Sequence, residues 1–273
     1  MGHLPVQRLR GEGPAMPSRK GGFSEGAPSE LSTLKAHLEA LHERYHRLAY
    51  RDRDPVSVVW EYSDPADEEV VGLWAALFAW GRREVAMQKV RLLLQAVGPH
   101  PAAALREGYP LQVSFRHRTW SPTDIAALWQ ALMRLYRRYG RLEAFFYPYR
   151  QRWEEGIAAF QEAILSSAPS LRRHIGYIRA GSASKRLQLW LRWMVRRDVI
   201  DPGPWEGFSP AVLFMPVDVH VARWAAQWGL LPHRPPTWKA VLALTSLFRQ
   251  LSPTDPLRYD FALVTAQTLL PHK

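Results

Sequence analysis

The 273-residue chain contains no cysteine. This absence excludes disulfides, a thiol nucleophile, iron–sulfur clusters and zinc sites built from thiolates. Ten histidines are present, but they are scattered, and none has the spacing to carboxylates that is typical of metal ligands. We therefore predict no metal site.

Long hydrophobic runs are also missing from the sequence. No apolar stretch approaches the roughly 20 residues that are needed to span a bilayer. The N-terminus has no hydrophobic segment of the kind found in signal peptides. We therefore expect a cytoplasmic protein that has no membrane partner.

Lysine is scarce, because only six of the 36 basic residues are lysines, and the formal net charge is +11. Residues 131–200 contain 14 Lys or Arg against 5 Asp or Glu. Charge concentrated in this way predicts a polyanionic partner, with nucleic acid ahead of acidic lipid. The alternative is a basic helical face that binds nothing specific.

The chain divides into a short tail and one long folded part. Residues 1–30 are rich in Gly, Pro and Ser without periodicity, which predicts a disordered tail in which Met16 is a possible alternative start. In residues 31–273 apolar side chains recur at helical spacing, and no alternating strand pattern occurs. This predicts an all-α domain, with helices near residues 32–50, 63–78, 83–97, 121–139, 151–166, 184–197, 218–229, 237–250 and 256–269. The run Val70–Phe78 is apolar nearly all round, as is typical of a central core helix.

The candidate chemistry lies in residues 181–230. Lys185 stands at a helix start between Arg179 and Arg186, and cationic neighbours favour the neutral, nucleophilic form of a lysine amine. Asp218 has the position of an N-cap, where backbone N–H groups keep a carboxylate ionised. Such a carboxylate can stabilise an oxocarbenium-like cation or orient a nucleophile. Taken singly, a phosphate-binding lysine and a capping aspartate are the plainer interpretations.

Several segments of the chain resemble, in order, the motifs of a known family. Pro216–Arg223 resembles the V-D-x-x-V-x-R segment of the helix-hairpin-helix DNA glycosylase superfamily. The whole set, over residues 33–270, resembles a mostly bacterial family in the archaeal 8-oxoguanine DNA glycosylase branch of that superfamily. The matching segments are Tyr62-Ser-Asp-Pro65, Ala79-Trp-Gly-Arg82, Gly181-Ser-Ala-Ser-Lys-Arg-Leu187, Leu191-Arg-Trp-Met-Val-Arg196, Pro216-Val-Asp-Val-His-Val221 and Arg258-Tyr-Asp-Phe-Ala-Leu263.

This resemblance implies two helical lobes of the helix-hairpin-helix glycosylase type, a DNA-binding cleft between them, and no cofactor. By the same resemblance, Lys185 attacks the deoxyribose C1′ and forms a Schiff base, and Asp218 activates the amine and stabilises charge on the sugar. Asp260 faces the extruded base, the alternative being a structural aspartate at a helix entry. Trp80 and Arg82 belong to the base pocket, although Trp80 is equally suited to the core.

The resemblance also implies contacts between the catalytic segment and DNA. The residues predicted to make them are Arg179, Gly181, Ser182, Ser184, Arg186 and Arg223. Ser184 stands where the family has Cys, and Val219 where it has Thr, and neither change removes a catalytic group. The glycine-rich hairpin of the superfamily is reduced here to residues 180–182, so neighbouring basic residues would replace its DNA clamp.

We therefore expect a monomeric, nucleoid-associated DNA glycosylase and AP lyase of base excision repair. Its partner would be double-stranded DNA with a damaged base, and 8-oxoguanine ranks first because of the resemblance. Such an enzyme has to flip its target base out of the duplex. Two alternatives stay open. One is a non-catalytic DNA- or RNA-binding module of the same fold, and the other is a glycosylase for uracil or an alkylated purine.

Overall fold

The computed structural model of the protein describes residues 28–232 and 234–269. Within these ranges the chain is helical and forms no strand, since its two β-bridges, His117–Trp120 and Ser182–Thr237, are isolated. The predicted all-α class is confirmed. Most of the tail predicted at residues 1–30 lies outside the described residues. Helix α1 begins at Pro28, however, so the last three residues assigned to the tail are helical.

The first part of the chain contains more elements than predicted. They are α1 (Pro28–Tyr45), α2 (Leu48–Arg51), the 3-10 helix η1 (Pro55–Glu61), α3 (Pro65–Phe78), α4 (Arg83–Gln95) and α5 (Pro101–Glu107). The single helix predicted at residues 32–50 is wrong, because α1 ends at Tyr45 and α2 is a separate turn. Helix α5 was not predicted. Its seven residues are too few to show a helical period.

The remaining elements include, in order, the helices predicted from residue 121 onward, and between them lie short helical segments that were not predicted. These elements are α6 (Pro122–Tyr139), α7 (Leu142–Phe146), η2 (Tyr147–Tyr149), α8 (Trp153–Leu165), η3 (Pro169–Leu171), α9 (Arg172–Ile175), η4 (Ile178–Ala180), α10 (Lys185–Val195), η5 (Pro210–Val212), α11 (Val219–Gln227), α12 (Trp238–Leu251) and α13 (Asp260–Leu269). Helix α6 begins at a capping box formed by Ser121 and Asp124, and Gly140 ends it. Both signals are local, which is why this helix could be predicted to within one residue.

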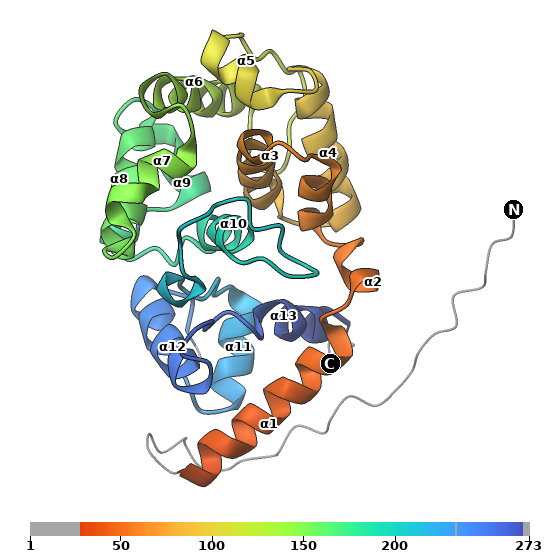
Figure 1. Ribbon diagram of the computed structural model, residues 1–273, viewed down its shortest axis with the longest axis vertical. Helices are drawn as coiled ribbons and strands as arrows, with labels where there is room; N and C mark the ends of the chain where they lie inside the picture. The colour runs from red at the N-terminus through yellow and green to blue at the C-terminus, as the bar shows by residue number, and fades with distance from the viewer. Residues whose placement is uncertain (1–27, 233, 270–273) are drawn as a thin grey trace, which may run out of the picture.

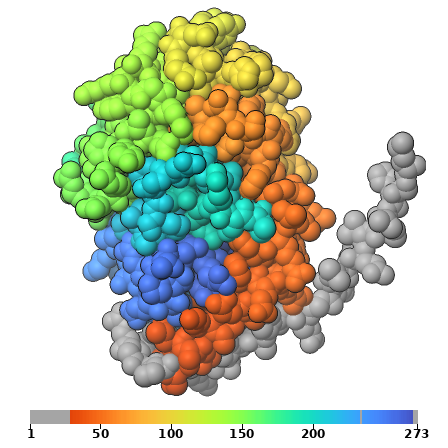
Figure 2. All heavy atoms as spheres, viewed as in Figure 1, coloured from red at the N-terminus to blue at the C-terminus, as the bar shows by residue number. Residues whose placement is uncertain are grey.

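The helices form two groups on either side of α10 (Figure 1). Helices α3 to α9 make the upper group of the view, and α11, α12 and α13 make the lower group together with the N-terminal helix α1. Residues near α10 and the loop after it form a teal band between the two groups (Figure 2). None of the helices in the described ranges has the length and apolar character needed to cross a membrane.

Helix α3 is the support on which α10 rests. Asp64 caps α3. Side chains of the helix interior are at most 1% exposed, among them Val70, Leu73, Trp74 and Leu77. The predicted core helix is therefore confirmed. Gly72 faces α10, where an added Cβ would lie 2.7 Å from Met194 Cε. The missing side chain allows the two helices to approach closely and fixes the position of α10.

Candidate functional site

A pocket of about 650 Å³ opens where the two groups of helices meet α10. Most of its wall comes from the loop between α3 and α4, the end of α9, the start of α10, the entry to α11, and α13, and the entry to η1 and Pro236 before α12 complete it. Such a volume lies within the range of small-molecule sites, roughly 300–1,000 Å³.

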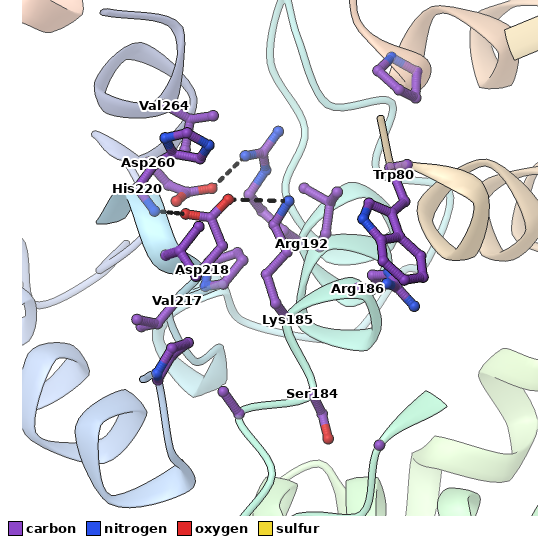
Figure 3. Close-up of a pocket in the computed structure, with 18 of the residues that line it drawn as sticks. Trp80, Ser184, Lys185, Arg186, Arg192, Val217, Asp218, His220, Asp260 and Val264 are labelled. Carbon is purple, nitrogen blue, oxygen red and sulfur yellow. Dashed lines mark hydrogen bonds and ion pairs between the residues drawn. The ribbon is translucent and has the colours of Figure 1, made fainter. Parts of the chain in front are cut away.

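Lys185 and Asp218 point toward each other in this pocket (Figure 3). Lys185 is the first residue of α10, and its Nζ lies 3.5 Å from Oδ2 of Asp218. The other oxygen of Asp218 accepts hydrogen bonds from the backbone N–H groups of His220 and Val221, both at 2.9 Å. Asp218 is thus the predicted N-cap, and its second oxygen is left for the lysine. The side chains are 26% and 20% exposed, so both remain accessible to a ligand.

The start of α10 is held by a buried glutamine. Gln161 of α8 donates to the Ile175 carbonyl at 3.2 Å and to Ser184 Oγ at 2.9 Å, and its Oε1 accepts from the Ile178 N–H at 3.0 Å. Ser184 has φ 46°, a left-handed conformation that is uncommon for a non-glycine residue. Its hydroxyl is buried against Gln161. The Ser184 hydroxyl is therefore engaged inside the protein and helps to set the direction in which α10 leaves the loop, whereas the predicted contact of Ser184 with DNA stays a prediction.

The short loop before α10 has no amide to offer a phosphate at its tip. The N–H groups of Ala180 and Ser182 donate to the Tyr177 carbonyl, and that of Gly181 donates to the Ile178 carbonyl. The Gly181 carbonyl in turn accepts from the Trp238 N–H at 2.8 Å. Gly181 and Ser182 were predicted to bind DNA, but their backbone donors are used inside the protein. The reduced hairpin is therefore tied to the start of α12, and its predicted contact with DNA stays a prediction.

A buried ion pair lines the pocket beside Lys185. Asp260 Oδ2 lies 2.5 Å from Nη1 of Arg192, and both side chains are at most 2% exposed. Asp260 Oδ1 has no hydrogen-bond partner within the described part of the chain. Burial raises the pKa of the Asp260 carboxyl, although the Arg192 guanidinium acts in the opposite direction. The predicted position of Asp260 in the pocket is thus observed, whereas its role toward a base stays a prediction.

Arg192 was not among the predicted site residues. It follows Lys185 by about two helical turns, so both side chains lie on the same face of α10. That spacing was available in the sequence and could have identified it. Its second partner, Asp201, accepts from Nη2 at 2.9 Å and is fully buried.

Trp80 lies at the pocket edge with 42% of its surface exposed, so the alternative that placed it in the core is wrong. The Arg186 guanidinium lies 4.7 Å from the centre of its ring and also donates to the His174 carbonyl at 3.1 Å. Burial lowers the pKa of Arg186. Arg186 therefore holds the indole from one side, as Figure 3 shows, and is not a freely moving surface arginine.

Three other predicted residues lie outside the pocket lining. Arg82 caps α4 and is exposed, while its neighbour Arg83 lines the pocket and contacts Thr268 Oγ1 at 3.4 Å. Arg179 pairs with Glu162 at 2.6 Å on the surface. Arg223 is exposed on α11. Arg82 is therefore not a pocket residue, and Arg83 takes that position.

The basic excess predicted over residues 131–200 does not form one surface. Arg192 and Arg196 are buried among aspartates. The exposed arginines of α6, including Arg138, lie in the upper group of Figure 1 and do not line the pocket. A count of charges along the sequence cannot separate buried from exposed arginines. Within the described ranges, no cluster of three or more His, Asp or Glu side chains could hold a metal ion.

The geometry defines an all-α protein with a lysine and a carboxylate paired in a pocket. The family described as Protein of unknown function (DUF2400) matches residues 54–268, and the chain belongs to it. Its match includes every pocket-lining residue named above. No curated protein and no solved structure matches the chain.

Proposed function

We propose that the protein is a DNA glycosylase with AP lyase activity, which excises a damaged base through a lysine Schiff base. One observation carries the proposal: the Lys185 amine faces the Asp218 carboxylate at 3.5 Å, in a pocket that also contains the buried Arg192–Asp260 pair. A nucleophile next to a base is the arrangement that covalent catalysis requires.

The chemistry begins with proton transfer from the Lys185 ammonium to Asp218. The neutral amine attacks C1′, the C1′–N bond breaks, and its electron pair leaves with the base, which takes the proton from Asp218. The new ammonium returns a proton to Asp218. The nitrogen lone pair then forms the C1′=N bond as the C1′–O4′ bond breaks and O4′ takes up that proton. In the lyase step the Asp218 carboxylate takes a proton from C2′, the electron pair of that C–H bond forms the C2′=C3′ bond, and the C3′–O bond breaks so that the 3′ phosphate leaves with its electron pair.

We assign recognition of the base to the buried Arg192–Asp260 pair and to the indole of Trp80. Arg192 supplies N–H donors, and the unpaired Oδ1 of Asp260 supplies an acceptor. Trp80 offers an exposed aromatic face at the rim. A purine that carries both carbonyl and N–H groups, such as 8-oxoguanine, suits this set of groups. The family resemblance is what ranks 8-oxoguanine first.

The two groups of helices would act as the two glycosylase lobes, with duplex DNA across the pocket mouth and a single flipped nucleotide inside. Flipping costs a few kcal/mol, and a damaged or mispaired base lowers that cost. No cofactor is required, because the amine and the carboxylates supply the nucleophile and the proton transfers. We also propose that the protein acts as a monomer and is associated with the nucleoid.

Borohydride trapping tests the proposal directly. Hydride adds to C1′ of the Schiff base, so the wild-type protein should become covalently attached to duplexes that carry a target lesion or an abasic site. Lys185→Gln should abolish the adduct and keep DNA affinity. Lys239→Gln is the matched control, because Lys239 is an exposed lysine of α12 outside the pocket lining and its loss should leave trapping unchanged.

The lesion panel has to contain 8-oxoguanine, uracil and alkylated purines, each opposite all four bases. Trapping with uracil or an alkylated purine alone would replace 8-oxoguanine as the substrate. If the wild-type protein binds DNA or RNA but forms no adduct with any lesion or abasic site, the protein is a binding module and the lyase proposal is wrong.

A further inference from the structure

A short turn at the pocket rim carries an arginine in a strained conformation. His117 and Trp120 exchange two backbone hydrogen bonds, at 3.1 and 2.9 Å, and close a turn with Arg118 and Thr119 at its tip. Arg118 has φ 55° and is exposed. Glycine and asparagine are the residues that suit this left-handed position. An arginine here therefore suggests that its side chain has a function that outweighs the strain.

The base of this turn is rigidly anchored. His117 is buried, and its Nε2 lies 2.8 Å from the Phe78 carbonyl oxygen. Trp120 is fully buried and stacks on His174, with the ring centres 3.8 Å apart. The backbone of Arg118 is consequently presented by a fixed support, and little backbone entropy is lost when the side chain binds a ligand.

The turn lies beside the pocket. The Arg118 guanidinium covers Gly81, where an added Cβ would overlap it, and Gly81 and its neighbour Trp80 both line the pocket. No carboxylate in the described part of the chain pairs with Arg118. This differs from Arg173 next to it, which is neutralised by Asp124 at 2.7 Å. Arg118 is thus a cation without an ion-pair partner among the described residues, and it stands on an anchored turn at the edge of the site.

We infer that the 117–120 turn is a contact surface for duplex DNA, in which Arg118 binds a backbone phosphate next to the nucleotide that enters the pocket. This inference rests on the proposed function for the identity of the nucleotide. The anionic backbone matches the bare guanidinium, and a phosphate contact fixes the register of the duplex over the pocket.

The inference makes opposite predictions for stability and for binding. Arg118→Asn and Arg118→Gly relieve the left-handed strain, so the melting temperature should stay equal or rise. Both changes remove one phosphate contact. The slope of log Kd against log salt should therefore fall in magnitude by about 0.9, and affinity for an abasic-analogue duplex should drop roughly fivefold in 0.15 M salt. Arg118→Lys keeps the charge and should keep most of the slope.

Arg138→Gln is the matched control, because it removes another exposed arginine, from α6 and away from the pocket lining. Its salt slope should equal that of the wild type. An unchanged slope in Arg118→Asn, an equal change in both variants, or absence of duplex binding by the wild type would overturn the inference. If Arg118→Asn lowers the slope while no lesion is trapped by the wild type, the DNA surface stands and the proposed enzyme activity fails.

Discussion

At the scale of single residues, Asp260 is the most informative side chain of the site. It is 1% exposed, its Oδ2 pairs with Arg192, and its Oδ1 is buried without a partner among the described residues. A buried acceptor left unpaired costs about 1–3 kcal/mol. An unpaired acceptor at a pocket wall can accept a hydrogen bond from a donor group of a ligand. This is the role proposed for Asp260 toward the base.

Asp260→Asn tests this role with little change in volume. The amide cannot hold the Arg192 guanidinium as a carboxylate does, and it presents a different pattern of donors toward the base. We expect base excision to fall by about 10- to 100-fold, the range of one charged hydrogen bond, and abasic-site cleavage to fall much less. Single-turnover rates on lesion and abasic duplexes give the comparison. Equal losses on both substrates would make Asp260 structural, and circular dichroism spectra must show that the variant is folded.

The residues of the site differ in how far the sequence could predict them. Lys185 and Asp218 stood out because lysine is scarce and because the N-cap position is a local signal. Arg192 shares a helix face with Lys185, so its place in the pocket could also have been predicted from the sequence. The exposure of Trp80 could not have been predicted, because it depends on how Arg186, more than a hundred positions away, stacks on the ring.

At the scale of elements, the turn at residues 117–120 and the short helix α9 form one unit. His174 of α9 is buried and stacks on Trp120, and its Nε2 lies 3.5 Å from Asp124 Oδ2. Burial lowers the pKa of His174 to about 4, with Arg173 and Arg186 acting in the same direction and Asp124 in the opposite one. The folded protein therefore keeps this imidazole neutral.

This shift predicts a pH dependence with a definite sign. Between pH 6.5 and about 4 the unfolded chain binds a proton at His174 and the folded protein does not, so the contribution of His174 to stability falls as the solution is acidified. The slope is at most about 1.4 kcal/mol per pH unit. The His174→Gln variant has no group at this position that titrates in this range, so it lacks this pH-dependent contribution to stability. The gap in unfolding free energy between wild type and variant should therefore be largest above pH 6.5 and shrink toward pH 4.

Urea unfolding of both proteins at several pH values measures that gap. Taking the difference removes other groups that titrate in the same range, such as His42, whose pKa burial lowers to about 4, and Glu68, whose pKa burial raises to about 7. Asp124 stays ionised throughout. Burial acts against its charged form, but hydrogen bonds from Ser121 and Arg173 outweigh burial and lower its pKa to about 2. A gap that is constant with pH would contradict the prediction.

Helices with local signals could be predicted from the sequence, and those defined by tertiary contacts could not. The capping box of α6 and the N-cap of α11 are set by neighbours in the chain. By contrast, the left-handed Ser184 that begins α10 depends on Gln161 of α8, which bonds to it and to two backbone groups of the preceding loop. No pattern within residues 175–185 contains that information.

At the scale of the whole molecule, a network of charges around two buried arginines joins α10 and the loop after it to the lower group of helices. Arg192 and Arg196 of α10 both bind Asp201, and Arg196 also binds Asp255 in the connection to α13. Asp198 in the loop after α10 lies 3.1 Å from His46, between α1 and α2. These arginines added to the positive count of the sequence, but in the fold they connect distant segments and do not contact the solvent.

Asp201→Asn should show how much the attachment of α10 to the lower group of helices depends on this network. Breaking a buried ion pair by removing one partner typically costs about 3–5 kcal/mol, because the opposite charge is left uncompensated in the interior. Since Arg192 also lines the pocket, the yield of the borohydride adduct should fall together with stability. Chemical denaturation and trapping on one abasic duplex measure the two effects.

Asp52→Asn is the matched control. Asp52 is 63% exposed in the side chain and pairs with its neighbour Arg51, and an exposed pair of this kind contributes about 0–1 kcal/mol. Its loss should leave both stability and adduct yield nearly unchanged. Should Asp201→Asn behave like Asp52→Asn, the network does not hold α10 against the lower group of helices. The position of Arg192 at the pocket would then have to come from the packing of α10 on α3 alone.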